Sequence, residues 1–352
     1  MVSKRLDFKS TYLYKLRWIC ILLVLIAFLG ILNFFPGFVQ DYYRLMFFHV
    51  LRIIFDPILD LLPFSAIWIL TVGTIAALIK ASSKLDIANP LWWLNSACKF
   101  IVFFYILWGF NYKAPELKDL LPVSPSTIEL DENQLVGLIT KMNDELAIGS
   151  STAFSQSPTG TATREIREAV KSFLRSNQLS APGNPKIVFA QGNVLRRIGI
   201  SGIYLPYTFE LYVDNSLLPA QHYFTIAHEL GHAFGYTNEG EANFIACISL
   251  LESKNSDHQA VAKFEILQEA LYRLNYLNED LFDANYKILN SGIKQELELR
   301  KSEAEKYRNW LWTISSYSND IFLKFQGQES GNQSYSGFLE YCISWNPSLT
   351  QQ

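Results

Sequence analysis

The stretch TIAHELGHAFGYTNEGEANFIACISL, residues 225–250, decides the fold of the second half of the chain. Its HELGH motif places His228 and His232 four residues apart, with Glu229 directly after the first histidine. Side chains four residues apart project from one face of a helix, so both imidazoles can bind a single Zn²⁺ while Glu229 leans toward the metal-bound water. The stretch therefore predicts a helix that carries a zinc site.

The surrounding residues favour that helix. Pro219 suits a first helical turn, the residues AQHYFTIAHELGHAF contain no interior proline, and Gly235 stands where the helix should end. After the glycine, Asn238 is predicted to cap a second helix, which begins in NEGEANFIACISLLE. Two consecutive helices are thus expected to form the site.

The third metal ligand must come from the residues that follow HELGH. The spacing in HELGHAFGYTN also fits the metzincin pattern, which would assign this role to Asn238. An amide oxygen is a poor zinc ligand, and the methionine turn of that class is impossible because the methionines are Met1, Met46 and Met142. The metzincin assignment is therefore rejected.

Two carboxylates remain, those of Glu239 and Glu241. With Asn238 as the N-cap, Glu241 falls at the third helical position, where its carboxylate can bond back to the backbone of the cap. Glu239 and Asn243 are four residues apart and share a helix face, so one can bind the metal while the other hydrogen-bonds a ligand histidine. Glu239 is the preferred ligand, and Glu241 stays open as the alternative.

The apolar residues are concentrated in the N-terminal third. The chain has 352 residues and a formal charge of −3, which gives no reason to expect a nucleic-acid partner. Three apolar runs, at residues 18–35, 61–79 and 96–112, each approach the roughly 20 residues that cross a bilayer. A start of the third run at Ser96 rather than Leu91 keeps Lys99 near its end. We predict three transmembrane helices.

The flanking residues predict the orientation of these helices. The first run leads into Asn33 and Pro36 rather than a small-residue cleavage site, which favours an anchor over a signal peptide. Basic residues precede the first run and follow the second, whereas Arg44 and Arg52 are balanced by aspartates in the first loop, so the N-terminus is expected inside. With three spans everything after Tyr112 lies outside the cytoplasm; with two it would lie inside.

The rest of the chain divides at two stretches rich in Ser, Thr and Pro, residues 121–127 and 150–161. Periodicity predicts helices at 131–146, at 164–177 and, strongly charged, near 293–312, and strands at 186–190 and 202–215. We expect an α+β, mostly helical fold with a small sheet. The predicted regions are a membrane region at 1–112, a juxtamembrane helix with linkers at 113–161 and a catalytic domain at 162–352.

Two of the four cysteines, Cys247 and Cys342, fall in the predicted catalytic domain. A disulfide between them and a pair of buried free thiols both agree with the sequence. The chain contains no CxxC motif, so a zinc site made of cysteines is excluded.

HELGH followed by ExEAN resembles the gluzincin pattern, in which a Glu and, four residues later, an Asp or Asn follow the HExxH helix. The pattern maps onto Glu239 and Asn243. The whole chain also resembles an uncharacterised bacterial family of membrane-anchored zincin-like proteins, domain-of-unknown-function family 3810, through residues 105–117, 199–210, the HELGH block and 322–341.

That resemblance implies three N-terminal spans in the bacterial inner membrane, an extracytoplasmic zincin-like domain and a zinc site, but no substrate. The family usually has Ala where Gly231 stands, which is a small-for-small change.

These features support one leading hypothesis, a membrane-anchored zinc metallopeptidase that acts on a peptide or protein substrate. His228, His232 and a glutamate would hold Zn²⁺, and Glu229 would act as the general base. Residues 204–213 would pair with the peptide as an edge strand, and the Tyr335 phenol would donate to the oxyanion.

Two rivals belong to other classes: a catalytically inactive zincin-fold membrane binding module, and a scaffold whose aromatic-rich spans gather partners. Zinc content separates the scaffold from the others, and the substitution Glu229→Gln separates an enzyme from a binding module.

Overall fold

The computed structural model describes residues 2–83, 88–146, 148–326, 328, 331 and 337–350. These residues are mostly helical with a three-stranded sheet, which confirms the predicted α+β class. Contacts divide the chain into two compact units. Unit 1 comprises Met1–Pro115, Pro182–Lys186 and Leu205–Glu210, and unit 2 comprises Glu116–Ala181, Ile187–Tyr204 and Leu211–Gln352. The division predicted at residues 112 and 161 is not tested by these contacts and stays a prediction.

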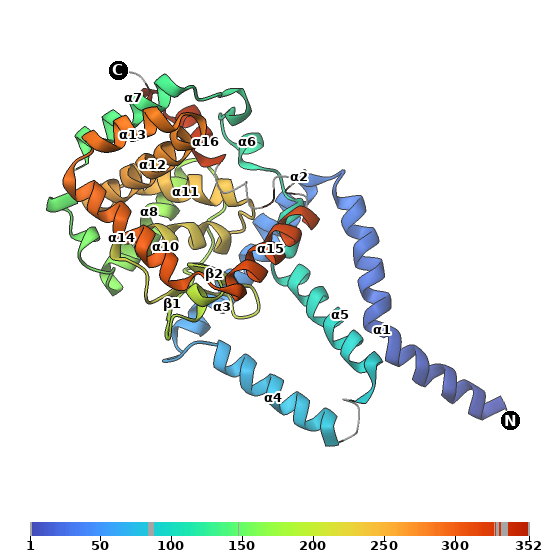
Figure 1. The fold of residues 1–352 in the computed structure, drawn as a ribbon. Helices are drawn as coiled ribbons and strands as arrows, with labels where there is room; N and C mark the ends of the chain where they lie inside the picture. Colours follow the sequence, from blue (N-terminus) through green and yellow to red (C-terminus); the bar gives the residue numbers. More distant parts are fainter. Residues whose placement is uncertain are drawn as a thin grey trace. The chain divides into compact units, whose positions relative to one another are not determined.

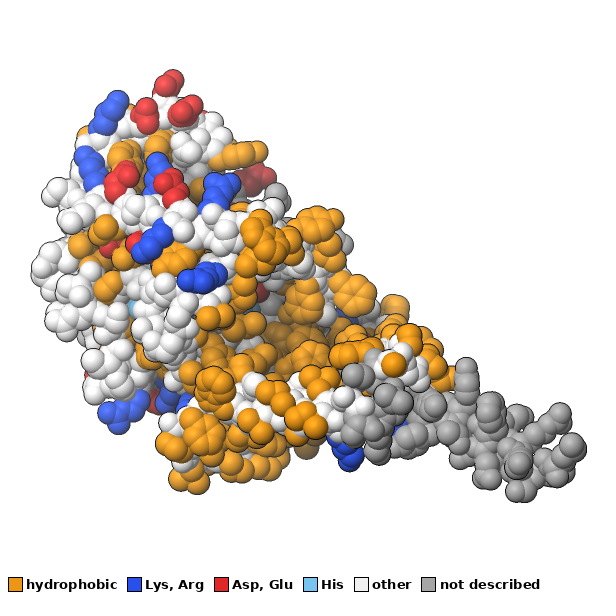
Figure 2. Space-filling model, turned by 60° about the horizontal axis from the view of Figure 1, so that its bottom comes forward, with side chains coloured by type: hydrophobic (Ala, Val, Ile, Leu, Met, Phe, Trp, Pro, Cys, Tyr) orange, Lys and Arg blue, Asp and Glu red, His pale blue; other side chains and the backbone are white. Residues whose placement is uncertain are grey.

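Unit 1 is a series of helices from the N-terminal third of the chain (Figure 1). They are α1 (Val2–Leu32), α2 (Pro36–Phe38), the π-helical η1 (Val39–Phe48), α3 (His49–Asp60), α4 (Ile67–Ser83), α5 (Pro90–Leu107) and the short η3 (Gly109–Lys113). Helix α1 packs on α5 through Leu25, Leu29, Val102 and Tyr105. Most of the exposed large hydrophobic side chains belong to this unit, and Figure 2 shows such side chains gathered on the surface.

Length and composition make α5 the one described helix that is apolar and long enough by itself to cross a membrane. The pair Leu16–Leu32 and Pro36–Asp60 passes the same test together but bends by 112° at the break, and the apolar part of α4 is shorter. The described part of the chain thus holds one candidate span, or two if the bent pair counts as one. The three-span arrangement stays a prediction.

Helix α5 begins earlier and ends earlier than predicted, at Pro90 and Leu107 instead of 96 and 112. Asn89 caps it by accepting a hydrogen bond from the backbone N–H of Leu91, and proline favours the first turn. Lys99 therefore lies inside the helix, where its ammonium is 5.8 Å from the ring centroid of Trp18. This cation–π contact offsets part of the cost of a charge in an apolar helix.

Unit 2 contains the remaining helices and most of the sheet (Figure 1). In chain order the elements are α6 (Leu117–Leu120), η4 (Pro125–Thr127), α7 (Glu132–Glu145), η5 (Ile148–Ser150), η6 (Thr152–Phe154), α8 (Gly160–Ser176), β1 (Lys186–Ala190), α9 (Val194–Arg197), β2 (Gly202–Leu205), β3 (Glu210–Asp214), α10 (Pro219–Ala233), α11 (Glu239–Leu251), α12 (Ser256–Leu277), α13 (Glu279–Ile288), α14 (Ser291–Tyr307), α15 (Trp310–Phe325), α16 (Phe338–Trp345) and η8 (Pro347–Leu349).

The core of unit 2 is built on α10 and α11. These two helices pack on each other, and α8 and α12 pack on both of them. Nearly every residue of α10 and α11 is buried. A helix that is covered on all sides must also bury its polar residues. The HELGH block is therefore held inside the unit and not on its surface.

The sheet corrects the prediction of one strand over residues 202–215. The order is β1-β3-β2, and Pro206 to Phe209 form a turn between β2 and β3. The turn forms because proline cannot donate to a ladder, Thr208 donates its N–H to Leu205 O, and Phe209 has a positive φ of 53°. Residues 204–213 are thus not one edge strand. Strand β3 is central and buried, and β2 lies at an edge.

Other predictions for this region are confirmed or corrected by local hydrogen bonds. Helix α7 forms where predicted, with a capping box between Asp131 and Gln134, and α8 follows as expected. The charged helix predicted near 293–312 is two helices, because Asn309 accepts from the N–H groups of Leu311 and Trp312 and starts α15.

Cys247 in α11 and Cys342 in α16 are free and buried. Burial and the neighbouring Cys247 thiol raise the pKa of Cys342 well above its usual value.

Candidate metal centre

Helix α10 presents His228, Glu229 and His232 from its last two turns. It begins at Pro219, as predicted. It ends at Ala233, and two residues further on Gly235, with a φ of +98°, reverses the chain; the N–H of Tyr236 donates to Gly231 O and that of Gly235 to His232 O. Only glycine adopts this left-handed conformation without strain. The reversal brings the following residues back toward the histidines.

Helix α11 begins immediately after this turn. Asn238 caps it by accepting from the backbone N–H of Glu241, as predicted. The cap makes Glu239 the first helical residue, and its buried carboxylate lies against both histidines. The close packing of α10 on α11 tolerates small residues: a Cβ added at Gly231 would lie 3.5 Å from Ala242 Cα, which is ordinary contact. An alanine at this position would therefore fit.

Three ligand atoms converge between the two helices. His228 Nε2 and His232 Nε2 are 3.1 Å apart, and Glu239 Oε2 lies 3.3 Å from the first and 3.2 Å from the second. Two atoms bound at about 2.0–2.1 Å to one zinc ion at a tetrahedral angle lie about 3.3 Å apart. Among the described residues, these three form a group that could hold a metal ion.

The other ring nitrogens fix the tautomers of the histidines. His232 Nδ1 lies 2.8 Å from the carbonyl oxygen of Tyr236, and His228 Nδ1 lies 2.7 Å from Asn243 Oδ1. Oxygens of this kind only accept, so each Nδ1 carries a proton and donates it. Each neutral ring then presents an unprotonated Nε2 to the centre, as a metal ligand requires.

The electrostatics of the three atoms call for a cation. Two nitrogen lone pairs and a carboxylate oxygen repel one another at these distances unless a positive charge lies among them. Without a metal, a proton takes that place: burial alone would lower the pKa of His232, but the Glu239 carboxylate raises it to about 9. Burial alone would raise the pKa of Glu239, but His232 and His228 lower it. The donor set of two imidazoles and one carboxylate fits Zn²⁺.

Glu229 lies beside this group with one oxygen unsatisfied. Its side chain is buried, and within the described residues Oε2 has no hydrogen-bond partner. Burial raises the pKa of Glu229, while a hydrogen bond from the backbone of Tyr204 in β2 lowers it. A buried carboxylate oxygen without a donor is costly and needs an explanation, which an incoming water would supply.

Strand β2 approaches Glu229 closely. A Cβ added at Gly202 would lie 2.8 Å from Glu229 Cγ and 2.7 Å from Thr225 Cγ2, so only glycine fits there. Together with the Tyr204 hydrogen bond, this contact holds an edge of the sheet against the general-base candidate. The sequence gives no sign of either contact. In both, backbone of β2 touches the Glu229 side chain, about 25 positions further along the chain.

Glu241 has a different environment from Glu239. Its Oε1 accepts hydrogen bonds from the backbone N–H of Leu117 at 2.5 Å and from Tyr341 Oη at 3.4 Å. The predicted bond back to the N-cap is replaced by these contacts between distant segments, which the sequence could not reveal. Tyr335, the predicted oxyanion donor, lies outside the described residues.

The fold and the site define the class: an α+β chain in which two consecutive buried helices carry a His-His-Glu group. The model of a family described as proteins of unknown function, DUF3810, matches residues 43–343, so the chain belongs to that family. No curated protein and no solved structure matches the chain significantly.

Proposed function

We propose that this protein is a zinc-dependent hydrolase that cleaves peptide bonds. The observation that carries the proposal is the group of three ligand atoms within 3.1–3.3 Å of one another beside the unsatisfied oxygen of Glu229. Two imidazoles and one carboxylate, with a carboxylate base adjacent, form the donor set of hydrolytic zinc sites. His228, His232 and Glu239 would hold the ion.

When bound, Zn²⁺ would polarise the substrate carbonyl and lower the pKa of a water molecule. Glu229 Oε2 takes the proton from that water as it attacks the carbonyl carbon, and returns it to the leaving amine. The Tyr204 N–H holds the other side of the Glu229 carboxylate in position. Strand β2, at the edge of the sheet, offers backbone groups to an extended peptide, which favours a peptide over other carbonyl substrates.

We also propose that the protein is anchored in a membrane. The apolar helix α5 and the bent apolar pair support this. In the arrangement that the sequence favours, α1, α4 and α5 span the bilayer, the N-terminus is cytoplasmic and the hydrolase lies outside.

The test is zinc content and peptide cleavage of the full-length chain in detergent. We expect about one zinc per chain in the wild type and in Glu229→Gln, with cleavage lost in Glu229→Gln. Glu239→Gln should lose the metal. Glu241→Gln is the matched control, because its amide oxygen can still accept from Leu117, and it should keep both metal and activity.

A folded wild type that carries no zinc would overturn the proposal. Zinc in all variants except Glu239→Gln, without cleavage of any peptide, would instead favour a metal-stabilised binding module.

A further inference from the structure

The helical segment Pro36–Asp60, formed by α2, η1 and α3, exposes many large hydrophobic side chains, which is unusual for a surface in contact with water. Ten of its large hydrophobic side chains are between 37% and 58% exposed. They are Phe38, Tyr42, Leu45, Met46, Phe47, Val50, Ile53, Ile54, Phe55 and Ile58. Soluble monomers rarely expose a contiguous apolar patch of more than roughly a few hundred Å².

The opposite side of the same segment buries charges. Arg44, Arg52 and Asp56 are each at most 2% exposed. Arg52 donates to Phe209 O at 2.9 Å and forms an ion pair of 2.8 Å with Asp56, which also accepts from the backbone N–H of Asn184. All of these partners belong to unit 1. The sequence places Arg44 and Arg52 in the loop between the first two predicted spans, whereas in the structure they lie on helices and are buried.

Charged groups that pair inside while apolar groups turn outward are typical of proteins surrounded by lipid. The exposed positions on α3 cover an arc of about 200° at 100° per residue, whereas a helix packed on a protein surface needs a stripe of about 100°. Lipid acyl chains can contact so wide an arc of a helix, whereas a single protein surface cannot. The bend of 112° from α1 returns the segment as a broken or re-entrant span would.

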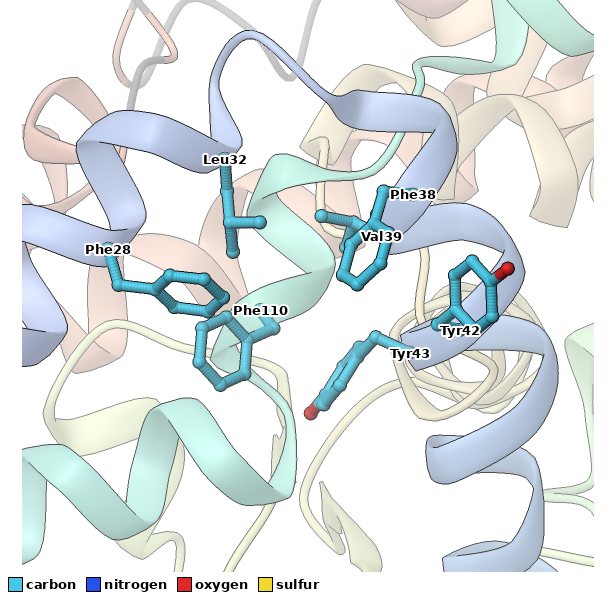
Figure 3. Close-up of a pocket in the computed structure, with 7 residues that line it drawn as sticks. All are labelled: Phe28, Leu32, Phe38, Val39, Tyr42, Tyr43 and Phe110. Atoms are coloured by element: carbon cyan, nitrogen blue, oxygen red, sulfur yellow. The ribbon is translucent and has the colours of Figure 1, made fainter.

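A cavity of about 190 Å³ opens at this bend (Figure 3). Seven side chains line it, all of them aliphatic or aromatic: Phe28, Leu32, Phe38, Val39, Tyr42, Tyr43 and Phe110. The Tyr43 hydroxyl donates to the carbonyl oxygen of Ile106 at 2.9 Å. The cavity is therefore suited to a hydrocarbon chain.

We propose that the Pro36–Asp60 segment lies within the bilayer, with its apolar face and the cavity at the bend in contact with lipid acyl chains. The inference rests on the proposed membrane anchoring and on residues of unit 1, and it does not depend on the metal centre.

The first test uses the wild-type chain in phosphatidylcholine and phosphatidylglycerol nanodiscs, exposed to hydroxyl radicals and analysed by mass spectrometry. Met46 is 58% exposed and Tyr276 of unit 2 is 86% exposed. Water-borne radicals should modify Tyr276 several-fold faster than Met46, because lipid shields the methionine. Modification of Met46 as fast as that of Tyr276 would overturn the proposal.

Spin labels provide the second test. Labels at Met46→Cys, Val50→Cys and Ile54→Cys, in a Cys20→Ala background, should collide with oxygen more than with a polar nickel complex. A label at Lys301→Cys, an exposed position of α14, should show the reverse. Preferential collision with nickel at the three positions would mean a water-exposed face. Low collision with both reagents, with line broadening that grows with protein density, would mean that a second copy covers the face; either result overturns the proposal.

Discussion

Unit 1 exposes on η1 and α3 the kind of large apolar side chain that unit 2 buries in its core. In unit 2 the apolar residues of α8, α10, α11 and α12 form the core, and the surface carries most of the charges. In unit 1 the side chains of Arg44, Arg52 and Asp56 on η1 and α3 are buried, while most of the large apolar side chains of these helices are exposed. Because apolar groups are stable where water is absent, the contrast supports our proposal that unit 1 is surrounded by lipid.

Buried charged groups also have different surroundings in the two units. In unit 1, buried charged groups meet groups of opposite charge or polarity: Arg52 meets Asp56 and a carbonyl oxygen, and Lys186 donates to Leu59 O and Leu62 O. In unit 2, three acceptor atoms converge on one point and a fourth, Glu229 Oε2, has no donor among the described residues. Oppositely charged partners stabilise a fold, whereas converging acceptor atoms are suited to a cation, which is the basis of the proposed metal site.

The largest expected effect follows from breaking the matched pair in unit 1. Arg52→Leu would leave Asp56 buried without its counter-ion, and we expect α3 to lose about 3–5 kcal/mol of stability. The double variant with Asp56→Leu should recover most of this loss. Hydrogen exchange over α3 in detergent measures both. Equal losses in the single and double variants would show that the charges are not matched to each other.

Removal of the proposed zinc ion should affect unit 2 and not unit 1. With free zinc at about 100 to 1,000 times its dissociation constant, chelation should lower the free energy of unfolding of α10 and α11 by about 3–4 kcal/mol. Hydrogen exchange over these helices is the measurement, and α3 is the internal reference. An equal loss of stability in α3 and in α10 and α11 would contradict the proposal that the metal site belongs to unit 2 alone.

A smaller effect is expected from Asn243, which accepts a hydrogen bond from one histidine of the candidate metal centre. Asn243→Ala removes the acceptor for His228 Nδ1 and should weaken zinc binding by about 10- to 100-fold. Titration against a chromophoric chelator measures the affinity. Asn255→Ala, which removes the cap of α12, is the control and should leave the affinity unchanged. If both variants bind zinc like the wild type, Asn243 does not orient the site.

The smallest effect concerns a helix that the sequence alone predicts. Asp131→Ala removes the capping box of α7 and should cost about 1 kcal/mol, visible as faster hydrogen exchange in its first turn. Glu129→Ala, at an exposed position before the helix, should change nothing. No change in either variant would mean that the packing of α7 on α12 alone holds the helix.

Much of the site is local and so could be predicted. Pro219, the HELGH spacing, Gly235 and the cap at Asn238 act within a few residues, and the structure has all of them where the sequence placed them. The preference for Glu239 over Glu241 came from helix spacing, and the structure brings Glu239 to the histidines. The two glutamates differ because the carboxylate of Glu241 accepts a hydrogen bond from the backbone N–H of Leu117, which is more than a hundred residues away in the sequence.

The strands and the N-terminal third show where local patterns fail. Residues 202–215 are rich in β-branched and aromatic residues, yet Pro206 and a positive φ at Phe209 turn them into a hairpin, in which β2 is the edge strand. Residues 36–60 lie between two apolar runs, so the sequence predicts a loop there. The partners of Arg52 and Asp56, such as Asn184 and Phe209, are far along the chain, so only the fold shows that these charges are buried and paired.

The sequence by itself determined the mostly helical fold class, the two histidines with Glu229 between them, and the apolar runs. Helix periodicity and the signals that start and end a helix depend on residues close together in the sequence. Only the tertiary structure decided which glutamate joins the histidines, which backbone contacts Glu229, and which face of Pro36–Asp60 turns outward. Each of these depends on contacts between residues distant in sequence, and burial, which sets their energetic weight, exists only once the chain has folded.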